Sequence, residues 1–389
     1  MKKKSDIFED ESITVPGFEP WISKDDQKNV MNSLNQKMLT LGPNLDKFEK
    51  LFAKFTNAKY AIAVSNCTAA LHLSLKALGI KKEDEVIIPD LTFVADANSI
   101  IASNAKPVIV DINKNDFSIS VEEIQKKITK KTKAIIPVHI YGKVCNINEI
   151  VKISKEHNLH LIEDCAHAVG TYYKNKHVGN FGITGCFSFY PTKNLTTAEG
   201  GMVITNSKNV AEKIEQLRSH GMTKSLSKRY SEKYPWEYDV KEPGYNYRLD
   251  EIRSALGISQ LSRLNQINKL RKNAAQYYSK NLKKCKGVVV PEIVNDKSHS
   301  YHLYVIKITE DYKISRNKLF NKLKTAGIIT TVHWKPLHKF SAYKQFIKKS
   351  DKFPITSKTY EQILALPLFP KITREQQDRV IMKIEEYSK

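Results

Sequence analysis

Cysteine is scarce in this chain and follows no pattern. The 389 residues contain five cysteines with no Cys-x-x-Cys pair, and three of them lie inside apolar runs, where a free thiol behaves as a small hydrophobic side chain. This odd, dispersed set argues against a disulfide framework or a zinc site and fits a reducing cytoplasm, where we expect the protein to reside. No cluster of His, Cys and carboxylate residues has metal-ligand spacing, so we predict no catalytic metal.

Long hydrophobic runs are also missing. No apolar stretch approaches the roughly 20 residues that span a bilayer, and the basic start Met1 to Asp6 is not followed by an apolar segment. We therefore expect a soluble protein with no secretory signal and no membrane partner.

Arginine-rich stripes interleaved with aromatic residues are absent as well. The formal net charge is +22, but the excess is mostly lysine spread over the whole chain. Solvated helix faces account for most of that charge, so we predict no nucleic-acid partner. The positive field would instead attract a dianionic small molecule.

Repeats and low-complexity linkers are lacking, and what remains is a regular alternation of short apolar runs and helical segments. Near-continuous apolar strands bounded by helices indicate a mostly parallel sheet covered on both faces. The expected strands are Ala61–Val64, Val86–Ile88, Pro107–Val110, Ala134–Val138, His160–Ile162, Cys186–Phe189 and Met202–Thr205. The expected helices between or before them are Lys24–Met38, Pro43–Phe55, Thr68–Leu78, Val94–Ser103, Val121–Ile128, Ile147–Glu156 and Val210–Ser219.

A long helical pattern from Asp250 to Lys283 follows and should cross from a large domain into a smaller one. The remainder predicts a strand at His299–Ile308 and helices at Ser315–Ala326 and Thr373–Tyr387. We predict an N-terminal arm over residues 1–24, a large domain over 25–265 and a small C-terminal domain over 266–389.

Asp164 and Lys193 carry the strongest chemical signal. Asp164 ends one apolar run, and a later apolar run leads to Lys193 and then to Gly200-Gly201. Either residue alone has an ordinary explanation, because an Asp at a strand end often caps a helix and a Lys beside a turn is usually solvated. Together they match the needs of a pyridoxal phosphate (PLP) enzyme, in which a lysine forms the Schiff base and a carboxylate keeps the pyridine nitrogen protonated.

The segment from Leu161 to Asn206 resembles the core of the DegT/DnrJ/EryC1/StrS sugar aminotransferases, a branch of the fold-type I PLP enzymes. The resemblance extends from Leu41-Gly-Pro43 to His333-Trp-Lys-Pro-Leu-His338. It implies an α/β, aspartate aminotransferase-like fold, with a mostly parallel seven-stranded sheet in the large domain and a smaller α+β C-terminal domain. It also implies a ping-pong transaminase, in which L-glutamate leaves its amino group as pyridoxamine phosphate and Lys193 shuttles a proton while a keto-sugar is aminated.

The resemblance assigns cofactor contacts to several further residues. Asp164 matches the pyridinium partner, and His167 stands where many members have a glutamine touching the cofactor's 3-hydroxyl. Phe93 falls where an aromatic ring stacks on the pyridine face, although a core phenylalanine is the alternative. In Ser65-Asn-Cys-Thr-Ala-Ala-Leu71, backbone N–H groups and the Thr68 hydroxyl would converge on a phosphate at a helix N-terminus, with ordinary capping as the alternative. The expected phosphate contacts are Thr68, Ala69 and Ser188.

Two further motifs are assigned by resemblance to the partner subunit and the substrate. In Gly244-Tyr-Asn-Tyr-Arg-Leu-Asp250, Asn246 would reach the PLP phosphate of the neighbouring subunit, which implies a homodimer with shared active sites. Arg248, assigned to the substrate side, would support that loop or pair with an acid, and a structural ion pair is its ordinary alternative. His333 and His338 would line the sugar side and Lys335 would meet a phosphate, unless these are ordinary surface residues.

The implied substrates are L-glutamate and a nucleotide-linked sugar, foremost a 4-keto-6-deoxyhexose carried on GDP, UDP or dTDP. The segment Leu195 to Gly201 is similar to a loop of perosamine synthetases, which aminate C4 of a GDP-sugar. Specificity would depend on loops such as Tyr230 to Glu242, and the expected pathway is surface glycan or secondary metabolite synthesis.

Three alternatives stay open. Pyridoxamine-dependent sugar dehydratases replace the Schiff-base lysine, usually by histidine, so Lys193 argues against them. A transaminase acting on a cyclitol or an aminobenzoate precursor would use the same chemistry. A PLP-binding regulator or scaffold would be expected to lose some of Asp164, Lys193 and Asn246, and all three are present.

Overall fold

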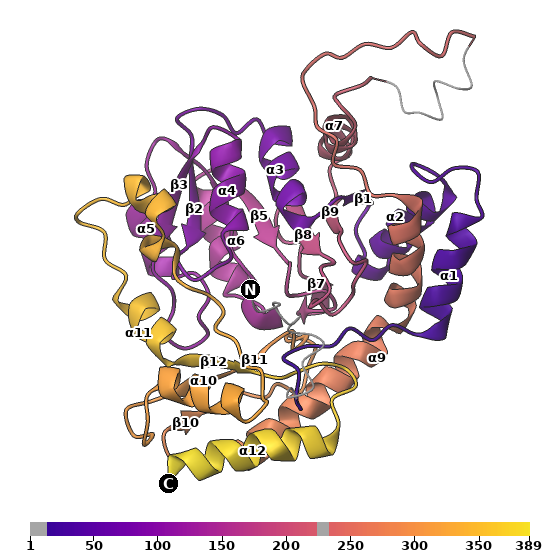
Figure 1. Cartoon of the computed structure of the whole chain (residues 1–389). Helices are drawn as coiled ribbons and strands as arrows, with labels where there is room; N and C mark the ends of the chain where they lie inside the picture. The colour runs from indigo at the N-terminus through magenta and orange to yellow at the C-terminus, as the bar shows by residue number, and fades with distance from the viewer. Residues whose placement is uncertain (1–13, 224–232) are drawn as a thin grey trace, which may run out of the picture.

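A seven-stranded sheet forms the centre of the molecule in the computed structural model, which describes residues 14–223 and 233–389 (Figure 1). The strand order is β1-β9-β8-β5-β4-β2-β3. Only β9 runs antiparallel to its neighbours, so the sheet is mostly parallel, as predicted. Its strands are β1 (Tyr60–Val64), β2 (Glu85–Pro89), β3 (Lys106–Val110), β4 (Thr132–Ile135), β5 (His160–Asp164), β8 (Thr184–Ser188) and β9 (Gly201–Thr205).

Helices cover both faces of this sheet because its strands alternate apolar side chains between the two sides. In β1, Ile62 and Val64 belong to one apolar cluster, whereas Ala61 and Ala63 belong to another. The first face is covered by α3 (Cys67–Ala77), α4 (Ala95–Ala102) and α7 (Lys208–Arg218). The second face is covered by α2 (Pro43–Thr56), α5 (Val121–Lys127), α6 (Ile147–Glu156) and the first half of α9 (Glu251–Leu282).

Helix α9 joins the central sheet to a smaller C-terminal unit, which lies below the sheet in Figure 1. Its first half packs on α1 (Lys24–Leu34) and α2, and its second half packs on α12 (Arg374–Ser388). The predicted boundary between residues 265 and 266 falls inside this continuous helix. The unit also contains β10 (Val288–Val289), β11 (Tyr304–Ile308), β12 (Ile363–Leu366), α10 (Arg316–Thr325) and α11 (Pro354–Gln362).

Several predicted bounds in the C-terminal half differ from the structure. The expected strand His299–Ile308 begins only at Tyr304, because the backbone N–H groups of Ser300 and His302 donate to carbonyls of the 3-10 turn η1 (Ile140–Gly142) instead of to a neighbouring strand. Sequence analysis also missed α11, β10, β12 and the hairpin of β6 (Tyr172–Tyr173) with β7 (Lys176–His177). The described residues also form the 3-10 turns η2 (Leu337–Lys339) and η3 (Ser341–Phe346).

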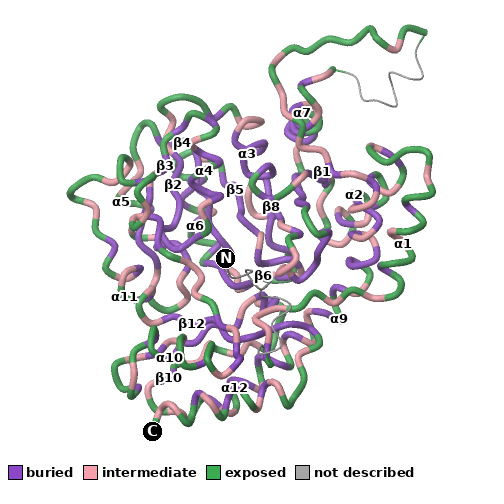
Figure 2. Tube along the Cα trace, viewed as in Figure 1, coloured by how far each residue is buried: buried purple, intermediate pink, exposed green. Residues whose placement is uncertain are grey.

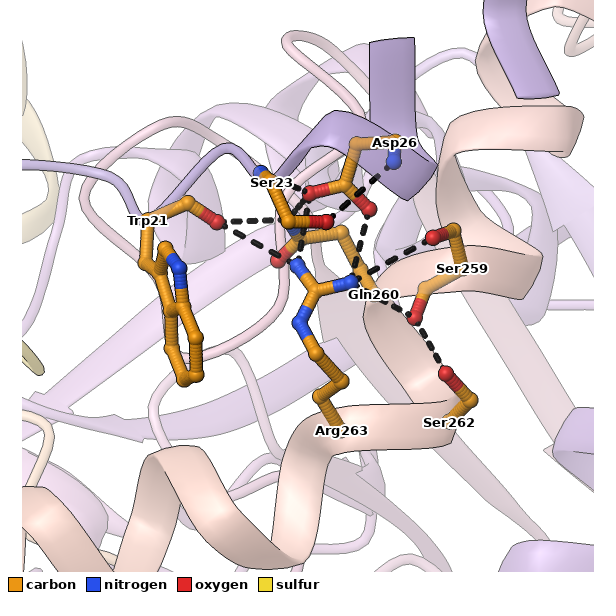
Figure 3. Close-up of polar contacts among 7 residues, drawn as sticks. All are labelled: Trp21, Ser23, Asp26, Ser259, Gln260, Ser262 and Arg263. Carbon is orange, nitrogen blue, oxygen red and sulfur yellow. Dashed lines mark hydrogen bonds and ion pairs between the residues drawn. The ribbon is translucent and has the colours of Figure 1, made fainter. Parts of the chain in front are cut away.

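The predicted N-terminal arm is described from residue 14 onward, and residues 1–13 lie outside the described part. Val15 is bound to the C-terminal unit, since its N–H donates to Gly327 and its carbonyl accepts from Ile329. Further along, the Trp21 carbonyl accepts from Gln260 of α9 at 3.0 Å, and Arg263 holds Asp26 with contacts of 3.0 and 2.6 Å (Figure 3). The second half of the arm is therefore anchored along α9.

Burial follows this arrangement, with the sheet and the inner helix faces buried and the loops exposed (Figure 2). Within the described ranges, no helix combines the length and apolar character needed to cross a bilayer.

Candidate active site

A cavity of about 670 Å³ opens at the carboxyl ends of the sheet strands. Open α/β sheets bind their ligands at this edge. Loops that follow β1, β2, β5 and β8 line it, together with two residues of the C-terminal unit. The lining residues are Ser65, Asn66, Cys67, Thr68, Leu71, Thr92, Phe93, Ala95, Val138, Ile140, Asp164, Ala166, His167, Ser188, Tyr190, Thr192, Lys193, Glu199, Arg253, His333 and Trp334.

Asp164 and Lys193 line this one cavity, as the sequence analysis expected of the pair. Asp164 is the last residue of β5, and its Oδ1 accepts a hydrogen bond from the Ala166 backbone at 2.8 Å. Burial raises the pKa of Asp164, and the Ala166 N–H and the Lys193 charge act in the opposite direction. Burial also lowers the pKa of Lys193 from 10.5 to about 8, against the opposing effect of Asp164.

The N-terminus of α3 forms one end of the cavity. Asn66 caps this helix by accepting the Ala69 N–H at 2.8 Å, so the predicted Ala69 donor is already used within the loop. Among the described residues, the N–H groups of Cys67 and Thr68 have no hydrogen-bond partner, and the positive end of the helix dipole reinforces their attraction for an anion. The predicted Ser188 lines the same cavity from the end of β8.

Gly201 allows β9 to approach this loop closely. A Cβ atom at Gly201 would lie 2.5 Å from the Asn66 carbonyl carbon and 2.8 Å from the Cys67 nitrogen. Any larger residue would therefore displace the helix N-terminus that faces the cavity.

Phe93 is not a core residue, since 53% of its surface is exposed. Its ring stands edge-on to Trp334 with centroids 5.9 Å apart, and both rings line the cavity. The alternative of a core phenylalanine is thereby excluded.

His167 has a defined tautomer. Its Nδ1 accepts the Tyr141 backbone N–H at 3.2 Å, so Nε2 must carry the proton of the neutral ring. Burial lowers the pKa of His167 well below its usual value, and the Lys193 and His333 charges lower it further. His167 therefore offers the cavity a neutral N–H donor.

The segment from His333 to His338 is only partly brought to the cavity. His333 lines it together with Trp334, and burial next to Lys193 lowers the pKa of His333 to about 4. His338, in contrast, is paired with buried Asp90 through Nδ1 at 2.5 Å and stacks on Phe353. Lys335 lies over the Phe340 ring, 4.7 Å from its centroid, so neither residue reaches the cavity predicted for it.

The Gly244 to Asp250 motif lies beside the phosphate-side loop without entering the cavity of its own chain. The Ser65 N–H donates to the Tyr247 carbonyl at 2.8 Å, and Arg248 forms a β-bridge with Val64. Asn246 is exposed, and neither Asn246 nor Arg248 lines the cavity.

One buried cluster has the composition of a metal site, which sequence spacing did not reveal. His139, Glu163 and Cys165 have their potential ligand atoms within 4.8 Å of one another. Glu163 already accepts from His139 at 3.0 Å and from the backbone of Gly179, Phe181 and Gly182. These bonds give the glutamate a structural role in holding the loop before β8.

Comparison with known proteins identifies the fold and its chemistry. The sequence matches the DegT/DnrJ/EryC1/StrS aminotransferase family over residues 20–385. The chain belongs to this family. It is 40% identical over 378 residues to the spore coat polysaccharide biosynthesis protein SpsC of Bacillus subtilis, with 96% of this chain and 97% of SpsC covered.

Solved structures agree with the family assignment. The putative sugar aminotransferase Spr1654 of Streptococcus pneumoniae, in its PMP form, superposes with a TM-score of 0.90 at 28% identity, covering 96% of this chain and 99% of Spr1654. PseC of Helicobacter pylori, an aminotransferase involved in pseudoaminic acid biosynthesis, gives 0.89 at 32% identity over 96% of this chain and 99% of PseC. Spr1654 has also been solved in a PLP form.

Four predictions are confirmed by these comparisons. They are the family resemblance, the fold-type I architecture with its mostly parallel seven-stranded sheet, the aminotransferase class and PLP as the cofactor.

Sequence reasoning missed other residues of this family member's cavity. Those with polar or aromatic side chains include Asn66, Thr92, Tyr190, Glu199, Arg253 and Trp334. Trp334 lies inside the quoted His333 to His338 motif, which was the available signal. Arg253 reaches the cavity through α9, where its Nε is held by Asp250 at 2.7 Å, and no local pattern pointed to it.

Proposed function

We propose that this protein transfers an amino group from L-glutamate to a keto group of a nucleotide-linked sugar, foremost a 4-keto-6-deoxyhexose. The observation that carries the proposal is the convergence of Lys193 and Asp164 on one cavity, with the pKa of Lys193 lowered to about 8 by burial.

The donor set of the cavity fits PLP. An anionic phosphate suits the N–H groups of Cys67 and Thr68 and the Ser188 hydroxyl, whereas a protonated pyridine nitrogen suits Asp164. Phe93 is placed to cover a flat ring, and His167 to donate to an oxygen substituent. When bound, PLP supplies the carbonyl that takes up the amino group and the conjugated ring that withdraws electrons from the reacting carbon.

Lys193 is the residue suited to moving the proton to and from the substrate carbon. With its pKa near 8, its amine is neutral in part of the molecules at neutral pH and can accept a proton from a substrate carbon. The remaining protonated fraction can return a proton, and the His167 and Asp164 contacts keep the reacting groups oriented.

Three features support a nucleotide-linked sugar as acceptor. SpsC and PseC, by their names, belong to polysaccharide and pseudoaminic acid biosynthesis. The cavity extends beyond the cofactor contacts to Tyr190, Glu199 and Arg253, which offer a ring, an acceptor and a cation. The formal net charge of +22 would attract a dianionic diphosphate. A GDP-linked sugar aminated at C4 remains our first candidate, by the Leu195 to Gly201 resemblance.

We also propose a homodimer in the cytoplasm in which Asn246 completes the neighbouring subunit's site. Asn246, a predicted contact of the PLP phosphate, is exposed and does not line the cavity of its own chain. The described residues that follow position 232 extend away from the body in Figure 1, and Tyr234, Trp236 and Val240 are exposed there. Clustered exposed apolar side chains of this kind mark association surfaces.

Of the predicted specificity loop Tyr230 to Glu242, residues 230–232 lie outside the described part.

The proposal is tested by following the transfer of the amino nitrogen from glutamate to the acceptor. The purified protein is incubated with ¹⁵N-labelled L-glutamate and a panel of keto-compounds, including GDP-, UDP- and dTDP-linked 4-keto sugars, a keto-cyclitol and an aminobenzoate precursor. We expect the label in a nucleotide-linked amino sugar, and none with Lys193→Ala.

Each rival function has its own outcome in this experiment. Label only in the cyclitol or aminobenzoate product would replace the proposed acceptor, and loss of water from the sugar without label would indicate a dehydratase. No label in any product would contradict the proposal and favour a regulator or scaffold.

A further inference from the structure

Asp96, the second residue of α4, is a fully buried carboxyl that neither the sequence motifs nor the proposed reaction has used. None of its surface is exposed. Its Oδ2 accepts the Thr92 hydroxyl at 2.5 Å. Its Oδ1 is also buried and has no donor partner among the described residues. A buried acceptor without a donor is costly, so the state of this oxygen requires an explanation.

The explanation lies in the neighbouring carboxyl. The side chains of Asp96 and Asp164 are within hydrogen-bonding reach of each other. Two carboxylates are both acceptors, and side by side in a buried site they cannot both be ionised at small cost. A single proton between them turns this repulsion into a hydrogen bond and gives the orphan oxygen its partner.

The surroundings decide which carboxyl keeps the proton. Asp164 receives the Ala166 N–H and lies near the positive charge of Lys193, and both favour its ionised form. Asp96 has only the Thr92 hydroxyl and the negative charge of Asp164, and its burial raises its pKa well above the usual value. The proton therefore belongs to Asp96.

We propose that Asp96 is a positioning residue: as a neutral acid it donates a hydrogen bond from Oδ1 to Asp164 and holds that carboxylate ionised and aimed at the cofactor nitrogen. The inference deepens the proposed function and rests on it for the role of Asp164. The Thr92 hydroxyl donates to Oδ2 of Asp96, so Oδ2 acts as the carbonyl oxygen of the neutral acid and Oδ1 carries the proton.

Within the described part of the chain, no other ionised group replaces this hydrogen bond. The groups that face the pair from the elements packed around it are Lys193, His139, Cys67, Cys165 and Cys186. Burial raises the pKa of all three thiols, so they remain neutral and supply no charge at ordinary pH. The Lys193 charge acts on Asp164, and the donor to Asp164 from the α4 side is Asp96.

Two variants of the full chain separate the hydrogen bond from simple space filling. Asp96→Asn keeps the size and an N–H donor, whereas Asp96→Leu keeps similar bulk without any donor. The dissociation constant of PLP is measured for both variants and the natural protein between about pH 5 and pH 9, alongside the thermal midpoint of the cofactor-free protein. The midpoint reports whether each variant is folded.

We expect Asp96→Asn to bind PLP within about threefold of the natural protein at each pH, because an N–H donor remains. Asp96→Leu should bind about tenfold more weakly near the acid end and recover as the pH rises. Without the donor the pKa of Asp164 rises, so Asp164 becomes protonated as the pH falls. If Asn and Leu weaken binding equally, or if neither changes it, the donor role is wrong.

A second readout keeps the inference distinguishable from the proposed function. The infrared spectrum of the cofactor-free protein at neutral pH should contain the carbonyl band of a buried neutral carboxylic acid, and Asp96→Asn should lack it. Absence of this difference overturns the inference even if the sugar is aminated. If the band and the binding pattern are present but no nitrogen is transferred, the proposed function fails and Asp96 keeps its role.

Discussion

At the scale of single residues, the chemistry depends on burial that shifts charged groups away from their usual state. Burial lowers the affinity of Lys193 for a proton, whereas the Ala166 N–H and the nearby Lys193 charge oppose the effect of burial on Asp164. These shifts create an amine that can act as a base beside a carboxylate that can hold a cation. Neither pKa shift could be calculated from the sequence, because burial is a property of the fold.

The lowered pKa of Lys193 predicts its reactivity in the cofactor-free protein. The neutral amine is the form that reacts with acylating reagents, so labelling of Lys193 should be half-maximal near pH 8. Asp164→Asn should move this midpoint lower, since the carboxylate raises the pKa of the lysine. Mass spectrometry of the labelled peptide measures both, and a midpoint near the ordinary 10.5 would contradict the account.

His167 offers a second test at this scale. His167→Gln retains an N–H donor, and we expect PLP binding to stay within about threefold of the natural protein. His167→Leu removes the donor and should weaken binding about tenfold, which corresponds to ~1.4 kcal/mol. Equal PLP dissociation constants for the leucine variant and the natural protein, measured by fluorescence titration, would show that the Nε2 proton is not used.

At the scale of elements, buried carboxylates hold the segments that shape the site. Glu251, at the start of α9, accepts the N–H groups of Gly42, Asn44 and Leu45 at 2.8, 2.7 and 3.0 Å and so caps α2. Asp111 in the same way accepts from the backbone of Ile355 and Thr356 at the start of α11. Each contact joins parts of the chain that are far apart in sequence, which is why no local pattern predicted them.

Glu251→Gln should lower the free energy of unfolding by about 2 kcal/mol, because charge-assisted bonds to a helix N-terminus are replaced by neutral ones. Glu292→Gln is the matched control, since the side chain of Glu292 is 76% exposed and its pair with Lys143 is worth little. Urea unfolding of both variants measures the difference. Similar midpoints for the two would mean that the Glu251 cap does not stabilise α2.

The sheet strands were predictable because each is a short, nearly continuous apolar run, as in β1 and β9. Other elements were not. The polar sequence of α11 carries no amphipathic signal strong enough to predict it, and β12 pairs with β11 only after the C-terminal unit has folded. His338 shows the same limit in the site, because buried Asp90, 248 residues away, holds it outside the cavity. The motif resemblance identified a segment that does reach the cavity through His333, but it could not show that His338 pairs with Asp90.

At the scale of the whole molecule, the proposed homodimer would complete each active site with a residue from the second chain. Asn246 is exposed and lies outside the cavity of its own chain, so the proposal assigns it to the site of the second copy. The exposed apolar residues of α1 and of residues 234–240 are the surface we propose for that contact. Met31 and Trp236 are 59% and 69% exposed, which is unusual for such large side chains in an isolated protein.

Shared sites predict complementation between two inactive proteins. In a mixed dimer of Lys193→Ala and Asn246→Ala chains, one site carries both changes and the other carries neither. Random mixing should therefore restore about a quarter of natural activity, because half of the dimers are mixed and each has one intact site. Glutamate-dependent amination after refolding the mixture measures this, and activity no higher than the sum of the separate variants would mean that each chain builds its site alone.

The most direct test of the central claim is the visible spectrum of the purified protein with PLP, before and after L-glutamate is added. The account predicts a yellow absorbance band that depends on Lys193, disappears with glutamate and returns when 2-oxoglutarate is supplied in excess. A protein that stays colourless with PLP, or a band that glutamate leaves unchanged, would contradict the claim that Lys193 and Asp164 form a working aminotransferase site.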